Sequence, residues 1–146
     1  MLVRFLPDFP NSQNEPFLLT SPQTPIYNCI AWAFGDSTKW YWPTDYPPNY
    51  WPPNIRRELD LQSFIELYQL IGYEQCIDAN FEVGFEKIAI FAFPNGEPTY
   101  AARQLPNGNW TSKMGPWHDV EHTLNSMNNS VGYGNATVIM SRRVVI

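Results

Sequence analysis

Cys29 is the residue of this sequence best placed to do chemistry. It follows Asn28, a residue type that favours the position just before a helix. The apolar run 29–34 ends at Gly35, so a short helix is expected to begin at the cysteine. Unpaired N–H groups at a helix start stabilise a thiolate, which makes Cys29 a candidate nucleophile. The alternative is a small buried apolar side chain, and Cys76, without such a helix start, is expected to be structural.

A nucleophilic cysteine needs a base, and the chain has two histidines, His118 and His122. They are expected on a short helix from 118 or 119 to about 127, where residues four apart share a face. His122 is the preferred catalytic base and His118 the second candidate, with surface or capping roles as the alternative. No third ligand is indicated, so no metal is expected. No phosphate loop or dinucleotide fingerprint indicates a cofactor.

The elements that must position these side chains suggest an α+β fold in one domain, residues 1–146. Ten of the 14 prolines lie in the first 53 residues, so 1–25 and 36–58 are expected to be irregular, aromatic-rich segments. A second helix is predicted after Asp60, ending at Gly72. Strands are predicted at about 87–93, 99–105, 109–113 and 136–140, the first three joined by Asn-Gly turns into an antiparallel meander.

Several polar and aromatic side chains are candidates for binding. Trp40 and Trp42 either pin the irregular segment to the core or form a stacking platform for sugars or peptides. Arg103 and Gln104 are adjacent on a predicted strand and therefore on opposite faces. Arg103 is expected to pair with a carboxylate, Asp119 or Glu121, and the alternative is an anion contact in a substrate groove. Further along, Ser112 and Lys113 are expected at a solvated strand end.

Blocks of the sequence resemble an uncharacterised family of small bacterial proteins. The blocks are Tyr-Asn-Cys-Ile-Ala-Trp-Ala at 27–33, Ala-Ala-Arg-Gln-Leu at 101–105, Trp-Thr-Ser-Lys-Met-Gly at 110–115 and Asp-Val-Glu-His at 119–122. The likeness runs from about residue 26 to 142. The family's layout is similar to that of papain-like and NlpC/P60-like cysteine hydrolases. This resemblance implies an antiparallel sheet packed against a Cys-bearing helix and further helices.

Tyr100 departs from the pattern of that family, in which a histidine commonly precedes the Ala-Ala-Arg-Gln block. A papain-like arrangement places its base there. A phenol with a pKa near 10 is a poor proton acceptor, although it can donate a hydrogen bond. Either the chain has lost the chemistry, or His122 or His118 supplies the base, or the family is not hydrolytic.

Two functions follow as expectations. One is a cysteine-dependent hydrolase or transferase acting on a peptide, protein or other amide-containing substrate. The other is a non-catalytic binding or regulatory module that uses the Trp/Tyr-rich segment on the same scaffold. The net charge of −5, from 9 basic and 14 acidic residues, argues against nucleic-acid binding.

The expected location is the cytoplasm. Residues 1–10 do not resemble a signal peptide, and no apolar run reaches the roughly 20 residues of a membrane span. Export by a non-classical route and the oligomeric state stay open.

Overall fold

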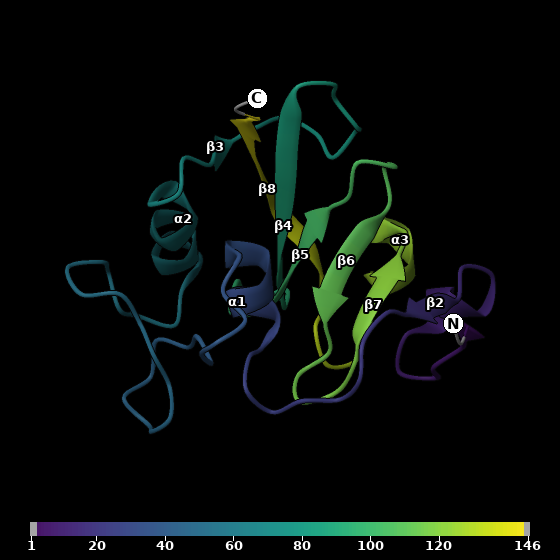
Figure 1. Cartoon of the computed structure of the whole chain (residues 1–146), viewed down its shortest axis with the longest axis horizontal. Helices are drawn as coiled ribbons and strands as arrows, with labels where there is room; N and C mark the ends of the chain where they lie inside the picture. Colours follow the sequence, from purple (N-terminus) through teal and green to yellow (C-terminus); the bar gives the residue numbers. More distant parts are fainter. Residues whose placement is uncertain (1–2, 145–146) are drawn as a thin grey trace.

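One antiparallel sheet organises residues 3–144, the part of the chain that this computed structural model describes. Within those residues its eight strands follow the order β1-β2-β7-β6-β5-β4-β8-β3 (Figure 1). The elements are β1 Val3–Arg4, the 3-10 helix η1 Pro10–Gln13, β2 Phe17–Leu19, α1 Cys29–Phe34, α2 Leu61–Gln69, β3 Glu74–Gln75, β4 Phe85–Ala92, β5 Pro98–Gln104, β6 Trp110–Lys113, β7 Asp119–His122, α3 Leu124–Met127 and β8 Asn135–Arg143. The predicted α+β class and antiparallel sheet are confirmed.

The centre of the sheet is the predicted meander. Strands β4, β5 and β6 lie within about two residues of their expected limits, and each pairs antiparallel with the next. Gly96 and Gly108 turn the chain between them with φ of 90° and 89°, values that glycine adopts without steric cost. The last strand, β8, is longer than expected and pairs along the whole of β4. Because it covers the free edge of β4, the meander lies inside the sheet.

The helix expected from residue 118 or 119 to 127 is wrong. Residues 119–122 form β7 instead, and only Leu124–Met127 is helical. The strand lies between β6 and β2 and pairs with both. Hydrogen bonding on both sides outweighs the weak helical preference of so short a segment. His118 and His122 therefore do not share a helix face.

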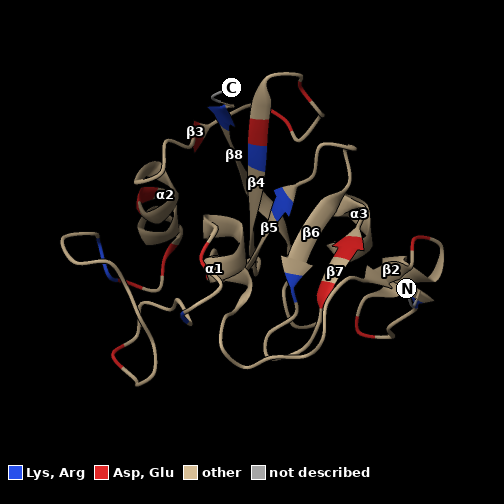
Figure 2. Cartoon of the chain, in the orientation of Figure 1, with Lys and Arg blue, Asp and Glu red and all other residues tan. Residues whose placement is uncertain are grey.

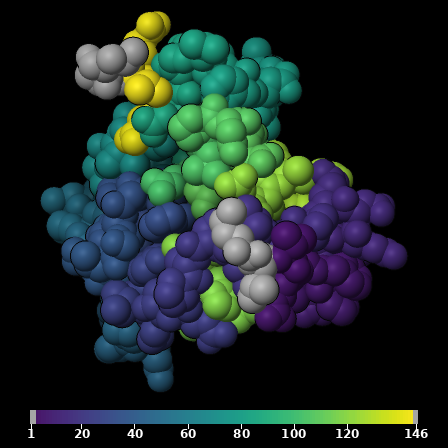
Figure 3. Space-filling view, turned by 45° about the vertical axis from the view of Figure 1, so that its right-hand side comes forward, coloured from purple at the N-terminus to yellow at the C-terminus, as the bar shows by residue number. Residues whose placement is uncertain are grey.

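The segment 1–25, expected to be irregular, contributes β1 and β2 to the edge of the sheet beyond β7. Side chains tie this segment to the region that follows β7. Asn11 donates to the backbone oxygens of Asn125 and Asn128, and Thr123 donates to Glu15. In the space-filling view the purple N-terminal region lies against the yellow-green part of the chain (Figure 3). Residues 1–2 lie outside the described part.

The predicted first helix, α1, begins at Cys29 and ends before Gly35, as expected. It packs on β5 and β6, so its first residue faces the middle of the sheet. Helix α2 lies next to it, against β3 and β4, and the Tyr68 hydroxyl of α2 donates to the Ile30 oxygen of α1 at 2.9 Å. None of the helices in residues 3–144 has the length and apolar composition needed to cross a membrane.

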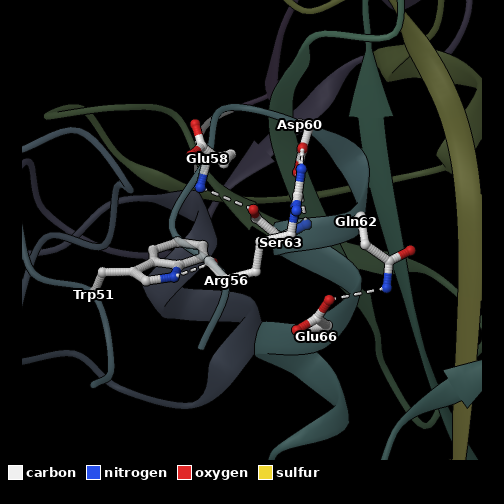
Figure 4. Close-up of polar contacts among 7 residues, drawn as sticks. All are labelled: Trp51, Arg56, Glu58, Asp60, Gln62, Ser63 and Glu66. Carbon is white, nitrogen blue, oxygen red and sulfur yellow. Dashed lines mark hydrogen bonds and ion pairs between the residues drawn. The ribbon is translucent and has the colours of Figure 1, made fainter. Parts of the chain in front are cut away.

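The start of α2 carries a dense polar cap (Figure 4). Asp60 accepts a hydrogen bond from the Ser63 backbone at 2.9 Å, and the Ser63 hydroxyl accepts one from the Glu58 backbone at 2.9 Å. Arg56 adds two short contacts to the Asp60 carboxylate, at 3.0 and 2.6 Å. This ion pair is exposed, so most of the stabilisation comes from the cap.

We expect Asp60→Ala to lower the free energy of unfolding by about 1 kcal/mol, because the helix loses its cap acceptor. Asp60→Asn is the matched control: it keeps an acceptor of similar capping strength, loses only the exposed ion pair, and should cost less than half as much. Urea denaturation followed by circular dichroism measures both. Equal losses in the two variants would mean that charge, not capping, stabilises this end of α2.

Candidate functional site

A cleft of about 300 Å³ opens over the start of α1. Its floor includes Asn28 and Cys29. Its walls come from the aromatic segment 36–58, from the start of β5, from the turn after β6 and from the loop before β8. The lining residues are Asn28, Cys29, Trp40, Trp42, Asn49, Thr99, Gly115 and Tyr133. All of these side chains are formally neutral. The cleft therefore offers aromatic faces together with amide and hydroxyl groups.

Asn28 joins the helix to the aromatic segment. Its side-chain oxygen accepts from the backbone N–H of Ala31, which caps α1, and also from that of Tyr41, both at 3.1 Å. Its amide nitrogen donates to the Tyr41 oxygen at 2.6 Å. The Tyr41 hydroxyl in turn donates to Asp36 at 2.8 Å. One buried amide thus fixes both the start of α1 and the segment that covers it.

The aromatic walls are anchored from behind. Trp42 packs edge-on against Phe64 of α2, with ring centroids 5.5 Å apart. Tyr133 stacks on Tyr100, with centroids 4.1 Å apart. Trp51, also from the aromatic segment, is buried on Phe64 and lies outside the cleft. The tryptophans thus divide between two roles: Trp51 pins the segment to the core, whereas Trp40 and Trp42 line the cleft.

The Cys29 thiol is neutral in this environment. The residue is 5 % exposed, and burial raises the pKa of the thiol to about 12, although backbone N–H groups of Ala101 and Ile30 favour the thiolate. The backbone N–H groups at the helix start thus favour the thiolate, but they do not set the net direction of the pKa shift. Loss of water around the sulfur outweighs the polarised end of a six-residue helix.

A chain of buried hydrogen bonds crosses the sheet beside the thiol. The Tyr100 hydroxyl on β5 donates to the Ser112 hydroxyl on β6 at 2.7 Å. Ser112 lies 2.7 Å from Nε2 of His122 on β7, and Nδ1 of that ring lies 2.7 Å from the Thr123 carbonyl oxygen. A carbonyl only accepts, so Nδ1 carries the proton and Nε2 accepts from Ser112. His122, the preferred base, thus accepts from Ser112, and Ser112 in turn accepts from Tyr100.

Burial also lowers the pKa of His122 to about 4, so its imidazole is neutral at physiological pH. Burial raises the pKa of Tyr100 well above 10, which keeps the phenol protonated. Every member of the chain is therefore uncharged. His118, in the turn before β7, is not part of it, because its Nδ1 lies 2.6 Å from the oxygen of Ser21, which follows β2.

The sequence predicted Ser112 and Lys113 at a solvated strand end, and this prediction is wrong. Both are fully buried. The Lys113 ammonium group donates to the Thr24 oxygen at 2.6 Å and to the Gly115 oxygen, and it lies 4.9 Å from the ring centre of Tyr27. Burial lowers the pKa of Lys113. Figure 2 shows this cation as the blue end of β6.

The predicted ion pair of Arg103 with Asp119 or Glu121 is absent from the described residues. Asp119 accepts from the Tyr27 hydroxyl through Oδ2, while its Oδ1 is buried without a partner in the described residues, and Glu121 accepts from Asn109. Arg103 instead stacks on Trp32 of α1, with its guanidinium carbon 4.4 Å from the ring centre. Gln104 donates to the Ala79 oxygen at 3.1 Å. Neither Arg103 nor Gln104 lines the Cys29 cleft.

Sequence reasoning did not single out four residues of the cleft: Asn49, Thr99, Gly115 and Tyr133. Their place depends on strand register and on the path of two loops, and no local motif marks them. Within residues 3–144, no three His, Cys, Asp or Glu side chains gather in a group that could hold a metal ion.

The fold and the cleft define an α+β protein in which a cysteine-bearing helix covers the middle of an antiparallel sheet. A family model described as "Domain of unknown function (DUF7689)" matches residues 18–141. The chain belongs to this family, which agrees with the sequence resemblance to an uncharacterised group. Comparison with curated proteins found no match, and comparison with solved structures found none either.

We expect Cys29 to react with iodoacetamide at pH 8 at least about 100-fold more slowly than free cysteine, because its thiolate fraction is far smaller. The measurement uses a Cys76→Ser variant, so that Cys29 is the remaining thiol. The matched Cys29→Ser variant reports Cys76, which is partly exposed. A rate profile with a midpoint at or below pH 8.5 would contradict the buried neutral thiol.

The neutral state of His122 predicts a loss of stability in mild acid. An unfolded histidine takes up a proton near pH 6.5, whereas the folded His122 does so only near pH 4. The free energy of unfolding should therefore fall by about 2 kcal/mol between pH 6.5 and pH 5. Denaturation of His122→Gln should lose this slope, and His118→Gln should keep it.

An NMR titration of the His122 ring in the unmodified protein gives an independent reading of the same quantity. A ring that titrates above pH 6 would overturn the prediction even if the Gln variant folds poorly.

Proposed function

We propose that this protein is a binding module that holds an amide-containing ligand, a peptide or a segment of a protein, in the Cys29 cleft. The proposal rests on the neutral state of the Cys29 thiol and the engagement of His122 with Ser112 and Thr123. A cysteine nucleophile needs a base within hydrogen-bond reach of its sulfur. Here His122 is hydrogen-bonded to Ser112, which accepts from Tyr100, and no hydrogen bond joins either histidine to the Cys29 sulfur within residues 3–144.

The lining of the cleft suits such a ligand. Asn28, Asn49 and Thr99 offer donors and acceptors for peptide groups. Trp40 and Trp42 offer flat apolar surfaces against which a side chain or a peptide plane packs. A charged ligand would gain little here, because no formal charge lines the cleft. Its volume of about 300 Å³ fits a few residues and not a folded domain.

A second candidate, a cysteine-dependent amide hydrolase or transferase of papain-like layout, is favoured by one observation. The chain Tyr100–Ser112–His122 is unbroken and ends on an imidazole whose Nε2 accepts from the Ser112 hydroxyl and could take up its proton. For catalysis the Cys29 thiol would first have to come within hydrogen-bond reach of the Tyr100 phenol; its proton would then pass to the phenol oxygen as the phenol proton moves to Ser112 and the Ser112 proton to His122. The attacking thiolate and an imidazolium would result, so charge and protons balance.

A peptide display library of random 12-residue segments provides the ligand for the test, and the selected peptides are then titrated by calorimetry. We expect Trp40→Ala and Trp42→Ala to weaken binding at least about fivefold, as loss of an aromatic contact of 1 kcal/mol or more implies. Cys29→Ala should change it less than twofold. Tyr46→Ala is the matched control, because Tyr46 is a 76 % exposed aromatic of the same segment outside the cleft.

The same peptides, incubated with the protein and analysed by mass spectrometry, distinguish the two candidates. Intact peptides with tryptophan-dependent binding support the binding module. Cleavage or acyl transfer that disappears in Cys29→Ala would establish the hydrolase instead. If the substitutions of Trp40 and Trp42 leave binding unchanged, the cleft is the ligand site of neither candidate function.

A further inference from the structure

Arg103 is a cation without a counter-ion among residues 3–144. Its Nε atom is buried and has no hydrogen-bond partner there. None of the ion pairs within those residues includes it. Figure 2 shows it as the blue part of β5. The contact with Trp32, 4.4 Å from the guanidinium carbon to the ring centre, provides no hydrogen-bond acceptor for Nε.

A buried donor without a partner costs free energy, and native structures rarely retain one without a reason. Glu86, which lines the same cavity as Arg103, is already paired with Arg142 at 3.1 Å. The stacking of Arg103 on Trp32 keeps the guanidinium in one orientation. The arrangement is that of a preoriented anion contact whose anion comes from elsewhere.

A separate cavity of about 510 Å³ has Arg103 in its lining. Its walls are mainly apolar and include Phe81, Phe85, Leu105, Pro106 and Val144. Phe81 is 48 % exposed, and Val83 in the same loop is 86 % exposed. The cavity shares no lining residue with the Cys29 cleft. Its size falls within the range of small-molecule sites.

We propose that this cavity binds a small monocarboxylate with an apolar body, whose carboxylate pairs with Arg103 and whose hydrocarbon part covers Phe81 and Phe85. A carboxylate matches the planar fork of a guanidinium and can accept two of its N–H groups. A single negative charge fits a single unpaired cation. A dianion such as phosphate would be repelled by Glu86, which also lines the cavity. The proposal stands independently of the function of the Cys29 cleft.

Decanoate is the probe, with decanol and decylammonium as neutral and cationic probes of the same chain length. We expect decanoate to bind in calorimetry and to shift the NMR signal of the Arg103 Nε–H group, and the other two to bind at least about tenfold more weakly. Arg103→Met keeps the aliphatic stem and should weaken decanoate binding at least about tenfold. Arg4→Met, an exposed arginine on the edge strand β1, is the matched control.

Phe81→Ser tests the apolar wall without removing a core residue, and it should weaken decanoate binding several-fold. This variant keeps the test decisive if Arg103→Met does not fold. Decanol that binds as tightly as decanoate would overturn the proposal. So would an Arg103 Nε–H signal that does not move at saturating decanoate, or the absence of binding at millimolar concentration.

Discussion

The side chain of Asn28 is the contact on which the site depends. It is 4 % exposed and makes three hydrogen bonds, one to the first turn of α1 and two to the backbone of Tyr41. A cap made by an ionised aspartate would satisfy the helix but could not also donate to the Tyr41 carbonyl, because a carboxylate only accepts. Because one amide serves both elements, the distance between the helix start and the aromatic segment is fixed. The cleft between them therefore exists without any ligand.

Burial, more than the helix end, determines what the thiol in that cleft can do. The polarised end of a helix favours a nearby negative charge by at most about 2 kcal/mol. The rise of the Cys29 pKa from 9.0 to about 12 corresponds to about 4 kcal/mol in the opposite direction. The same asymmetry explains why Tyr100, Ser112 and His122 form a neutral chain. Each of these three side chains makes a hydrogen bond, and none of the three is charged.

Helix caps and tight turns in the sequence were sufficient to predict the elements that they begin or join. Asn28 and Asp60 marked the starts of α1 and α2, and the Asn-Gly turns marked the meander. Strands β2 and β7 were missed because each is only three or four residues long and is stabilised mainly by the other and by β6. That error put His122 on a helix and concealed its contact with Ser112. The cleft depends on Asn49 and Tyr133, and Arg103 contacts Trp32 instead of a carboxylate. These are long-range contacts that no spacing in the sequence encodes.

Helix α1 links the two cavities, although they share no lining residue. Its first residue, Cys29, lies on the floor of the neutral cleft, and Trp32, one turn later, supports the guanidinium that lines the apolar cavity. Trp32 is itself held by a hydrogen bond to Thr111 at 3.2 Å. A helix of six residues is about 9 Å long and moves as one body. A change in the core of α1 would therefore disturb both cavities, whereas Trp40 and Phe81 each belong to only one of them. Helix α1 therefore positions two cavities of different chemistry, a neutral cleft with hydrogen-bonding groups and an apolar cavity with Arg103 in its lining.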